Sequence, residues 1–398
     1  MANSLNSSYF YGMDTVYNWG NRSYFTFFSE FNRPWNGIGV IEALIYIVIF
    51  LISVVANILI IIRVLRVRQL KTVTNCFIAN LAMADLLFSS GCPFIAVVRI
   101  TGTWVLGGFF CHIIIYLEFV CMFAVIWTMT VISIERFFCI VKPNCCRISL
   151  TMAIVIVILI WVIAFAGFLP MATFFNIYAF PFGNDTIQIC TLVWPSNTTV
   201  QVSIVFVSCL VLVGFIVPLA LMTHNYYRVF RTFWISRQTI IKKECSSSQP
   251  TVNMAVQPAA STLRSHSSKL VSHNMKVRSL RSLRVIRILV LLVLLFFLMW
   301  LPIFIAFIVI QYDGAYEYHQ MHSWMLITSS YFAFANTCVN PFVYVFINER
   351  FRITINFCRK TSKEQPKADE IASFSASANI DRSVCTTSLT PAFCSKLL

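Results

Sequence analysis

The stretch Leu150–Phe168 reads LTMAIVIVILIWVIAFAGF and contains no charged residue. A helix needs roughly 20 apolar residues to cross the hydrocarbon core of a bilayer, so this stretch predicts a transmembrane span. Six further stretches have the same character: Ile38–Ile62, Cys76–Val98, Phe109–Val131, Val200–Leu221, Ile288–Ile310 and Met325–Ile347. The pattern predicts an all-α membrane protein built as a bundle of seven transmembrane helices.

The composition of the whole chain agrees with a membrane protein. Of its 398 residues, 58% are hydrophobic and 11% are charged, whereas soluble globular chains have about 45–50% apolar and about 25% charged residues. A water-soluble fold cannot bury so much apolar surface without leaving large exposed patches. The composition therefore excludes a cytosolic enzyme, a disordered protein and a secreted disulfide scaffold.

Basic residues mark one side of the predicted membrane. The net charge is +15, and 27 of the 30 Lys and Arg follow the first, third or seventh span or lie between the fifth and sixth. Only Arg22, Arg33 and Arg99 fall on the other side. The positive-inside rule therefore places the N-terminus outside the cell and the C-terminus in the cytoplasm, which predicts a multi-pass protein of the plasma membrane. Because these charges border membrane spans, nucleic-acid binding is not expected.

Glycosylation sequons and cysteines give further information on sidedness. Four sequons all fall on the side predicted to be extracellular: Asn6, Asn21, Asn184 and Asn197. Most of the 14 cysteines lie in spans or on the cytoplasmic side, where thiols stay reduced. Cys111 and Cys190 are on the outer side, and a disulfide between them would tie the loop before the fifth span to the top of the third.

Segments of different composition surround the bundle, which is expected over residues 38–347. Residues 1–37 form an extracellular N-terminal segment, and the Ser-rich, basic loop at about 232–284 is expected to be disordered and cytoplasmic. Residues 348–360 place Phe351, Ile355 and Cys358 on one face of a short amphipathic helix, with Cys358 as a palmitoylation site. Residues 361–398 form a disordered cytoplasmic tail whose Ser and Thr are available to kinases.

Polar groups inside the predicted spans form an ordered set. Such groups are costly in a bilayer and by default suggest function. In chain order they are Asn57, NLAMADL at Asn80–Leu86, Glu135-Arg136-Phe137, Trp161, Pro218 with Tyr226, FFLMWLP at Phe296–Pro302, and NTCVNPFVY at Asn336–Tyr344. This order and spacing resembles the rhodopsin-like G-protein-coupled receptors, from the first span to Cys358. The resemblance implies a receptor, not an enzyme, that activates a heterotrimeric G protein and then engages receptor kinases and arrestin.

The resemblance also implies an activation switch. Its members would be Asp85, Ile126, Glu135, Arg136, Pro218, Tyr226, Phe296, Asn340, Pro341 and Tyr344. At rest Arg136 would pair with adjacent Glu135, and activation would free it for the G protein. A sodium ion at Asp85 is also implied, but Val125 stands where a hydroxyl ligand is usual, so a water-mediated polar network is the alternative. No other cofactor is expected.

Four local strings narrow the ligand. NRSYFTFFSE at Asn21–Glu30, TWVLG at Thr103–Gly107, ICTLVWP at Ile189–Pro195 and MWLPI at Met299–Ile303 resemble the long-chain (omega-3) free fatty acid receptors. This resemblance implies an acyl chain in a largely aromatic pocket, with walls from Trp104, Trp194, Phe206, Trp300 and Phe304. Arg99 is the basic residue at the outer end of the bundle and would bind the carboxylate. In the alternative, Arg99 extends to lipid headgroups.

Glu118 keeps a second ligand class open. It lies two turns into the third span, where amine-binding receptors carry the acid that binds the ligand ammonium. An ionised Glu118 would repel a fatty carboxylate unless it is protonated, distant or paired, for example with Arg99. The sequence therefore predicts a fatty acid receptor of the calcium-mobilising type, with a receptor for a cationic amine or peptide as the alternative. A seven-helix transporter or channel is the outside alternative, for which Glu42, Asp85 and Glu118 are too sparse a polar pathway.

Overall fold

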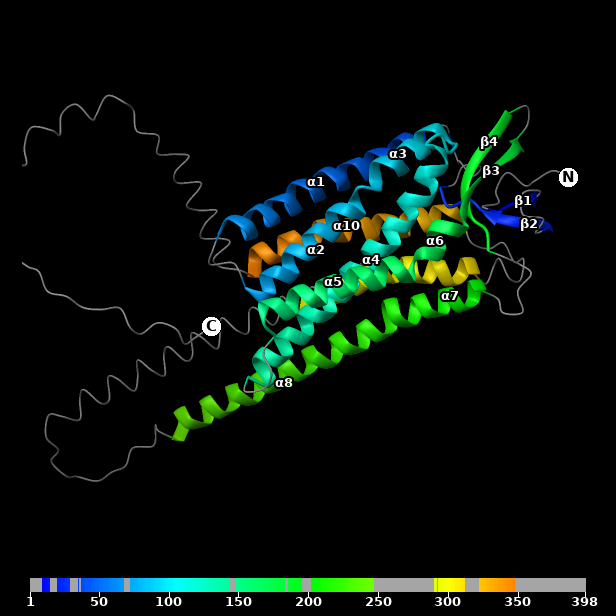
Figure 1. The fold of residues 1–398 in the computed structure, drawn as a ribbon. Helices are drawn as coiled ribbons and strands as arrows, with labels where there is room; N and C mark the ends of the chain where they lie inside the picture. Colours follow the sequence, from blue (N-terminus) through cyan, green and yellow to red (C-terminus); the bar gives the residue numbers. More distant parts are fainter. Residues whose placement is uncertain are drawn as a thin grey trace, which may run out of the picture. The chain divides into compact units, whose positions relative to one another are not determined.

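The computed structural model is mainly helical, and one compact unit ends at Ile347 (Figure 1). It describes residues 9–14, 20–28, 35, 37–67, 72–143, 148–182, 185–194, 202–246, 290–291, 293–311 and 322–347. The predicted amphipathic helix at 348–360 and the tail at 361–398 lie outside this part of the chain.

Within the described residues, six helical stretches are long and apolar enough to cross a membrane. They are α1 (Ile38–Arg66), α2 with α3 (Val73–Ser89 and Cys92–Thr101), α4 (Gly107–Val141), α5 with α6 (Leu150–Gly167 and Leu169–Phe174), α7 with α8 (Val202–Val211 and Val217–Ser246, joined by the π-helical turn η2 at Leu212–Ile216), and the helix Val293–Gln311. α10 (Ser323–Ile347) packs against α1 and α2 as the seventh helix of the bundle. The predicted seven-helix fold is confirmed.

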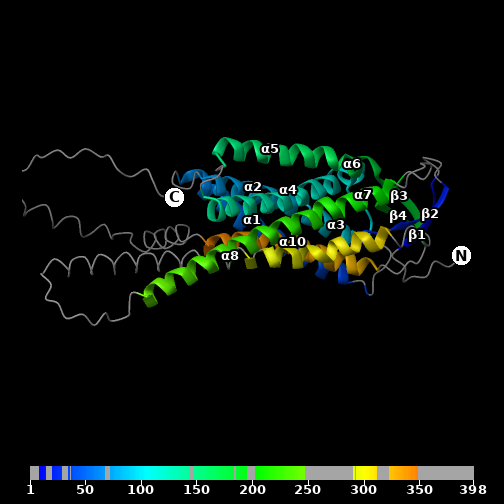
Figure 2. The ribbon, with the colours of Figure 1, turned by 90° about the horizontal axis from the view of Figure 1, so that it is seen from below.

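α4 lies at the centre of the bundle and contacts α2, α5 and α8 (Figures 1 and 2). In the most apolar 18-residue stretch of α4, 56% is buried. The corresponding share is 22% for α1 and 22% for α5 with α6. Exposed apolar side chains such as Leu44 on α1 and Ile158 on α5 therefore face outward. In a bilayer these side chains would contact lipid tails, which explains why they need no polar counterpart.

Two β-hairpins lie together at one end of the bundle, which we call the hairpin end (Figure 1). β1 (Tyr9–Asp14) pairs with β2 (Gly20–Phe25), and β3 (Phe175–Phe182) pairs with β4 (Asp185–Leu192), both antiparallel. A disulfide between Cys111 and Cys190 joins β4 to α4, with the two Cα atoms 5.7 Å apart. The predicted pairing of these two cysteines is confirmed.

Two helix boundaries differ from the sequence prediction. α8 continues to Ser246, so the prediction of a disordered loop from residue 232 is wrong for residues 232–246. This segment contains no Gly or Pro, and its basic residues end the apolar span without interrupting helical hydrogen bonding. The second predicted span is also divided at Ser90 and Gly91. Pro93 lies in the first turn of α3, where a missing N–H leaves no bond unmade.

Candidate functional site

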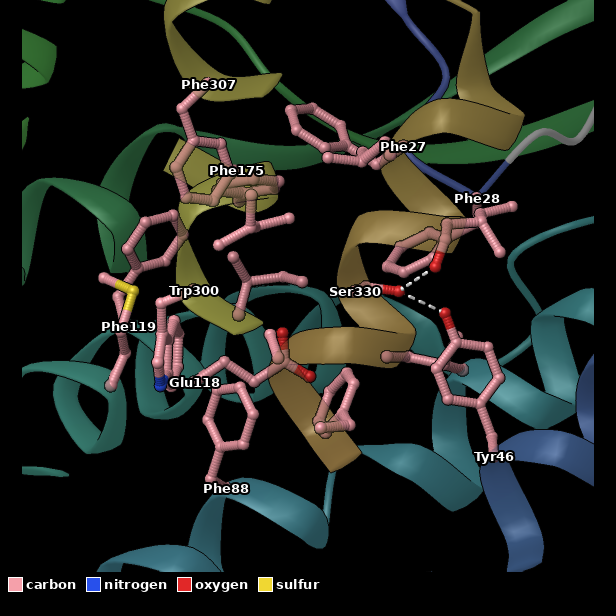
Figure 3. Close-up of a pocket in the computed structure, with 18 residues that line it drawn as sticks. Phe27, Phe28, Tyr46, Phe88, Glu118, Phe119, Phe175, Trp300, Phe307 and Ser330 are labelled. Atoms are coloured by element: carbon pink, nitrogen blue, oxygen red, sulfur yellow. Dashed lines mark hydrogen bonds between the residues drawn. The ribbon is translucent and has the colours of Figure 1, made fainter. Parts of the chain in front are cut away.

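A pocket lies within the bundle, toward the hairpin end (Figure 3). Its lining comes from α1, α2, α3, α4, α10, the helix Val293–Gln311, β3 and the segment after β2. Nine of the eighteen lining residues are aromatic: Phe27, Phe28, Tyr46, Phe88, Phe119, Phe175, Trp300, Phe307 and Phe334. Glu118 is the charged member, and the hydroxyls of Tyr46 and Ser330 lie 2.5 Å apart. The site is therefore suited to a largely apolar ligand.

Residues 25–28, here called the roof segment, contribute Phe27 and Phe28 to the lining of the pocket (Figure 3). The ring of Phe28 stacks on Trp104, with centroids 5.8 Å apart, and Phe27 packs on Phe175 at 5.4 Å. The hydroxyl of Thr191 in β4 donates a hydrogen bond of 3.0 Å to the carbonyl of Phe25. The roof segment is thus attached both to the bundle and to the second hairpin.

Arg99 has its partners in α1 and in the roof segment. Its Nε donates to Oε2 of Glu42 at 2.5 Å, Nη2 completes an ion pair with the same oxygen, and Nη1 donates to the carbonyl of Phe28. The Arg99 side chain is 1% exposed and does not line the pocket. A ligand carboxylate would have to displace Glu42, so Arg99 is not the free clamp predicted from the sequence. The pairing with Glu118 considered there is replaced by the pairing with Glu42.

The other predicted ligand contacts divide into two groups. Glu118 and Trp300 line the pocket. Three predicted wall residues are not part of the lining and pack against other aromatic rings. Trp194, which follows β4, and Phe206 in α7 contact each other at 5.3 Å, and Phe304 contacts Phe215 at 4.9 Å. Trp104 is buried beneath Phe28 and donates from Nε1 to the carbonyl of Gly107 at 3.0 Å.

Sequence reasoning missed Tyr46 as a pocket residue. A signal was present, because Tyr46, Ser53 and Asn57 are separated by seven and four residues and are all buried on one face of α1. This polar face points into the bundle, where Asn57 donates from Nδ2 to the carbonyl of Thr337 in α10 at 3.1 Å.

At the opposite end of the bundle, Glu135 and Arg136 form the ion pair predicted from their adjacency, with Nε and Oε2 3.0 Å apart. Thr74 in α2 links both partners. Its hydroxyl donates to Oε1 of Glu135 at 3.2 Å and accepts a bond from Nη2 of Arg136. Tyr226 is buried in α8. The side chain of Tyr344 lies outside the described part of the chain.

The remaining switch residues lie along the core. Ile126 and Phe296 are buried, and the Phe296 and Trp300 ring centroids are 6.0 Å apart. Pro218 lies in the first turn of α8, directly after η2, and Pro341 lies inside α10.

Asp85 lies in a buried amide network. Asn340 donates from Nδ2 to Oδ2 of Asp85 at 3.0 Å and to Oδ1 of Asn336 at 3.4 Å. Oδ1 of Asp85 and Oδ1 of Asn57 are buried without hydrogen-bond partners among the described residues. Across the same ranges no three His, Cys, Asp or Glu side chains cluster as metal ligands. The oxygens fit a sodium ion in part, since buried Val125 supplies none.

Several predicted modification sites cannot be located on the structure. Asn6, Asn184, Asn197 and Cys358 lie outside the described residues. Only the backbone of Asn21 is described, in β2, where its register partner is Met13.

Comparison with known proteins identifies the family. Residues 56–344 match the model of the 7 transmembrane receptor (rhodopsin family), and the chain belongs to this family. It is thus a multi-pass membrane receptor and not an enzyme, as predicted.

Several curated receptors are similar to the chain. The neuropeptide Y receptor type 2 of Gallus gallus is 31% identical over 46% of this chain and 49% of its own length. The substance-P receptor of Mus musculus is 26% identical over 79% of this chain and 69% of its length. The somatostatin-like receptor F_48D10.1 of Takifugu rubripes is 30% identical over 47% of this chain and 70% of its length. The chain thus spans about half of the neuropeptide Y receptor. These names give no support to the fatty acid resemblance.

Proposed function

We propose that the chain is a G-protein-coupled receptor for a lipid-like ligand with a long hydrocarbon chain, and that long-chain fatty acids are the first class to test. The observation that carries this proposal is the pocket lining, in which nine of eighteen residues are aromatic and Glu118 is the charged member among those described. Burial of each ligand CH₂ contributes about 0.8 kcal/mol, so a long chain gains most of its affinity from such walls.

Arg99 has a different role in this proposal from the one expected of a carboxylate clamp. Since it is already neutralised by Glu42 and bonded to the carbonyl of Phe28, we assign it to holding the roof segment. A fatty acid would then bind mainly through its chain, with its head group outside the Arg99 pair.

Signalling is proposed to follow a shift between two states of the bundle. Ligand binding against Trp300 would favour a state in which the helix Val293–Gln311 moves outward and Arg136 leaves Glu135. The freed Arg136 and Tyr226 would then contact a heterotrimeric G protein of the calcium-mobilising type. The N-terminus is proposed to be extracellular, and the tail after residue 360 to bind arrestin once kinases have phosphorylated it.

A peptide receptor is the second candidate. The curated relatives are named for neuropeptide Y, substance P and somatostatin, and Glu118 could accept a basic group of such a ligand. The aromatic lining of the pocket favours the lipid over the peptide, because nine of its eighteen residues are aromatic.

Two experiments test these proposals. A calcium assay in cells expressing the wild-type receptor compares long-chain fatty acids, long-chain amines and the three peptides. A response to fatty acids supports the lipid ligand, and its survival in Arg99→Ala at matched surface level would show that Arg99 does not bind the carboxylate. A response to peptides alone would favour the second candidate. Uptake of labelled ligand without G-protein activation would indicate a transporter.

Further proposals concern ions and modifications. Sodium would be held by the carboxylate of Asp85 with the amide oxygen of Asn57, and loss of sodium-dependent agonist affinity in Asp85→Asn tests this. Glycosylation at Asn6, Asn21, Asn184 and Asn197 and palmitoylation at Cys358 are tested by mass spectrometry of the purified receptor.

A further inference from the structure

Glu118 presents an unused acceptor to the pocket. Figure 3 shows its carboxyl group extending from α4 toward the interior of the site. Oε1 is buried and has no hydrogen-bond partner among the described residues. Arg99, the basic residue near this end of the bundle, is paired with Glu42. Among the other polar side chains of the lining, Tyr46 and Ser330 bond to each other, and Nε1 of Trp300 is buried without a partner among the described residues.

Gly91 makes room for this carboxyl group. A Cβ atom added at Gly91 would lie 2.2 Å from Oε1 of Glu118. The backbone of Gly91 has φ −67° and ψ −29°, which any residue can adopt. Glycine is therefore required here for space and not for backbone conformation. The junction of α2 and α3 forms a notch that receives the acid.

We infer that Glu118 binds a hydrogen-bond donor, a hydroxyl or an ammonium group, carried by an otherwise apolar long-chain ligand; this rests on the lipid-like ligand proposed above. A buried oxygen without a partner is unfavourable, and a ligand donor would remove that penalty. A plain hydrocarbon chain has no such donor, and a ligand carboxylate beside an ionised Glu118 would be repelled. The preferred ligand is therefore a hydroxylated or amino lipid in place of an unsubstituted fatty acid.

Three substitutions separate the two kinds of donor. Glu118→Gln keeps the size and a carbonyl acceptor, so binding of a hydroxyl survives while binding of an ammonium weakens. Glu118→Met removes the acceptor and weakens both. Gly91→Ala retains the acid but displaces its flexible end from the notch, and should alter the ranking of donors without unfolding the bundle. Ile158→Leu, on the outward face of α5 and outside the pocket lining, is the control.

The test measures G-protein activation in cells expressing full-length receptor at equal surface levels. The probes are octadecanoic acid, hydroxyoctadecanoic acids with the hydroxyl at successive chain positions, and octadecylamine. On the wild type, at least one donor-bearing probe should be more potent than octadecanoic acid. Glu118→Met should reduce its potency by roughly 10-fold or more, while the potency of octadecanoic acid stays the same or rises. Ile158→Leu should leave the ranking unchanged.

Other outcomes would contradict either the role of Glu118 or the proposal of a lipid ligand. Equal potency of all probes on the wild type, or an unchanged ranking in Glu118→Met and Gly91→Ala, would overturn the role of Glu118 and leave the lipid ligand intact. If every lipid is inactive while a peptide activates the receptor, the proposal of a lipid ligand is wrong, and the donor-binding role of Glu118 fails with it. Should Glu118→Met fail to reach the cell surface, Glu118→Gln and Gly91→Ala decide the question.

Discussion

Arg99 and Glu42 form an ion pair between α3 and α1, with Nε of the arginine 2.5 Å from Oε2 of the glutamate. The pair is almost fully enclosed, with exposed fractions of 1% and 14%. The guanidinium of Arg99 also donates a hydrogen bond from Nη1 to the carbonyl of Phe28. The buried guanidinium of Arg99 therefore joins α3 to α1 and to the roof segment.

Removal of the acid from this pair should destabilise the receptor. Glu42→Gln leaves the Arg99 charge buried without a counter-charge, and such single removals reduce the free energy of unfolding by about 3–5 kcal/mol. The double variant Glu42→Leu with Arg99→Met should lose less than the sum of the two single changes. Thermal unfolding of the purified receptor measures both effects, with exposed Arg66→Met as control. An unchanged unfolding midpoint in Glu42→Gln would contradict this account of the pair.

Truncation of Phe28 should shorten ligand residence. Phe28→Ala removes the ring that stacks on Trp104, while the bond from Arg99 persists because it is made to the main-chain carbonyl. We expect ligand dissociation to accelerate roughly tenfold, because interface changes act mainly on dissociation rates. A washout assay with the most potent ligand measures this rate. Phe109→Ala, whose ring is 72% exposed, is the control, and equal rates in the two variants would argue against a roof.

Loss of the Thr74 hydroxyl should raise basal signalling. Thr74→Val keeps the shape but removes both bonds to the Glu135 and Arg136 pair. A hydrogen bond contributes about 1 kcal/mol, which shifts the equilibrium between resting and active states roughly fivefold. G-protein activation without ligand is the measurement. Thr101→Val, which loses a hydroxyl bond to the Val97 carbonyl at the other end, is the control. Basal activity at or below that of the wild type would refute this role for Thr74.

A polar chain across three helices should contribute to stability. Trp161 donates from Nε1 to Oδ1 of Asn80 at 2.8 Å, and Asn80 donates from Nδ2 to Oγ1 of Thr128 at 2.8 Å. Trp161→Phe removes the first bond while keeping most of the ring, so we expect a loss of about 1 kcal/mol in the free energy of unfolding. Thermal unfolding of the purified receptor measures this loss. Trp234→Phe is the control, because the side chain of Trp234 is 50% exposed. Equal stability of both variants would exclude the contribution.

The features that could be predicted from the sequence depend on local or one-dimensional signals. The seven spans follow from apolar length, and the pairing of Glu135 with Arg136 from adjacency in the chain. The pairing of Cys111 with Cys190 could be predicted because both fall on the side of the spans expected to be extracellular, where a disulfide persists. Each of these inferences needs no knowledge of how the helices are rotated about their axes.

The features that could not be predicted depend on rotation and on distant contacts. Glu42 and Arg99 are 57 positions apart in the chain, and only the packing of α3 against α1 selects Glu42 over Glu118 as the partner. Helix rotation likewise decides that Phe206 packs against Trp194 and Phe304 against Phe215, and neither residue is part of the pocket lining. The roof segment has no helical or strand periodicity after Phe25, so its place above the pocket comes from aromatic contacts and the Thr191 bond.

The aromatic lining of the pocket determines which ligand concentration matters for the proposed lipid ligand. A long hydrocarbon chain is held mostly in the surrounding bilayer, because its apolar surface leaves water. The quantity that governs occupancy is then the mole fraction of ligand dissolved in the membrane. Two preparations given the same aqueous dose but different amounts of membrane would reach different occupancies, and apparent potency becomes a joint property of the receptor and its bilayer.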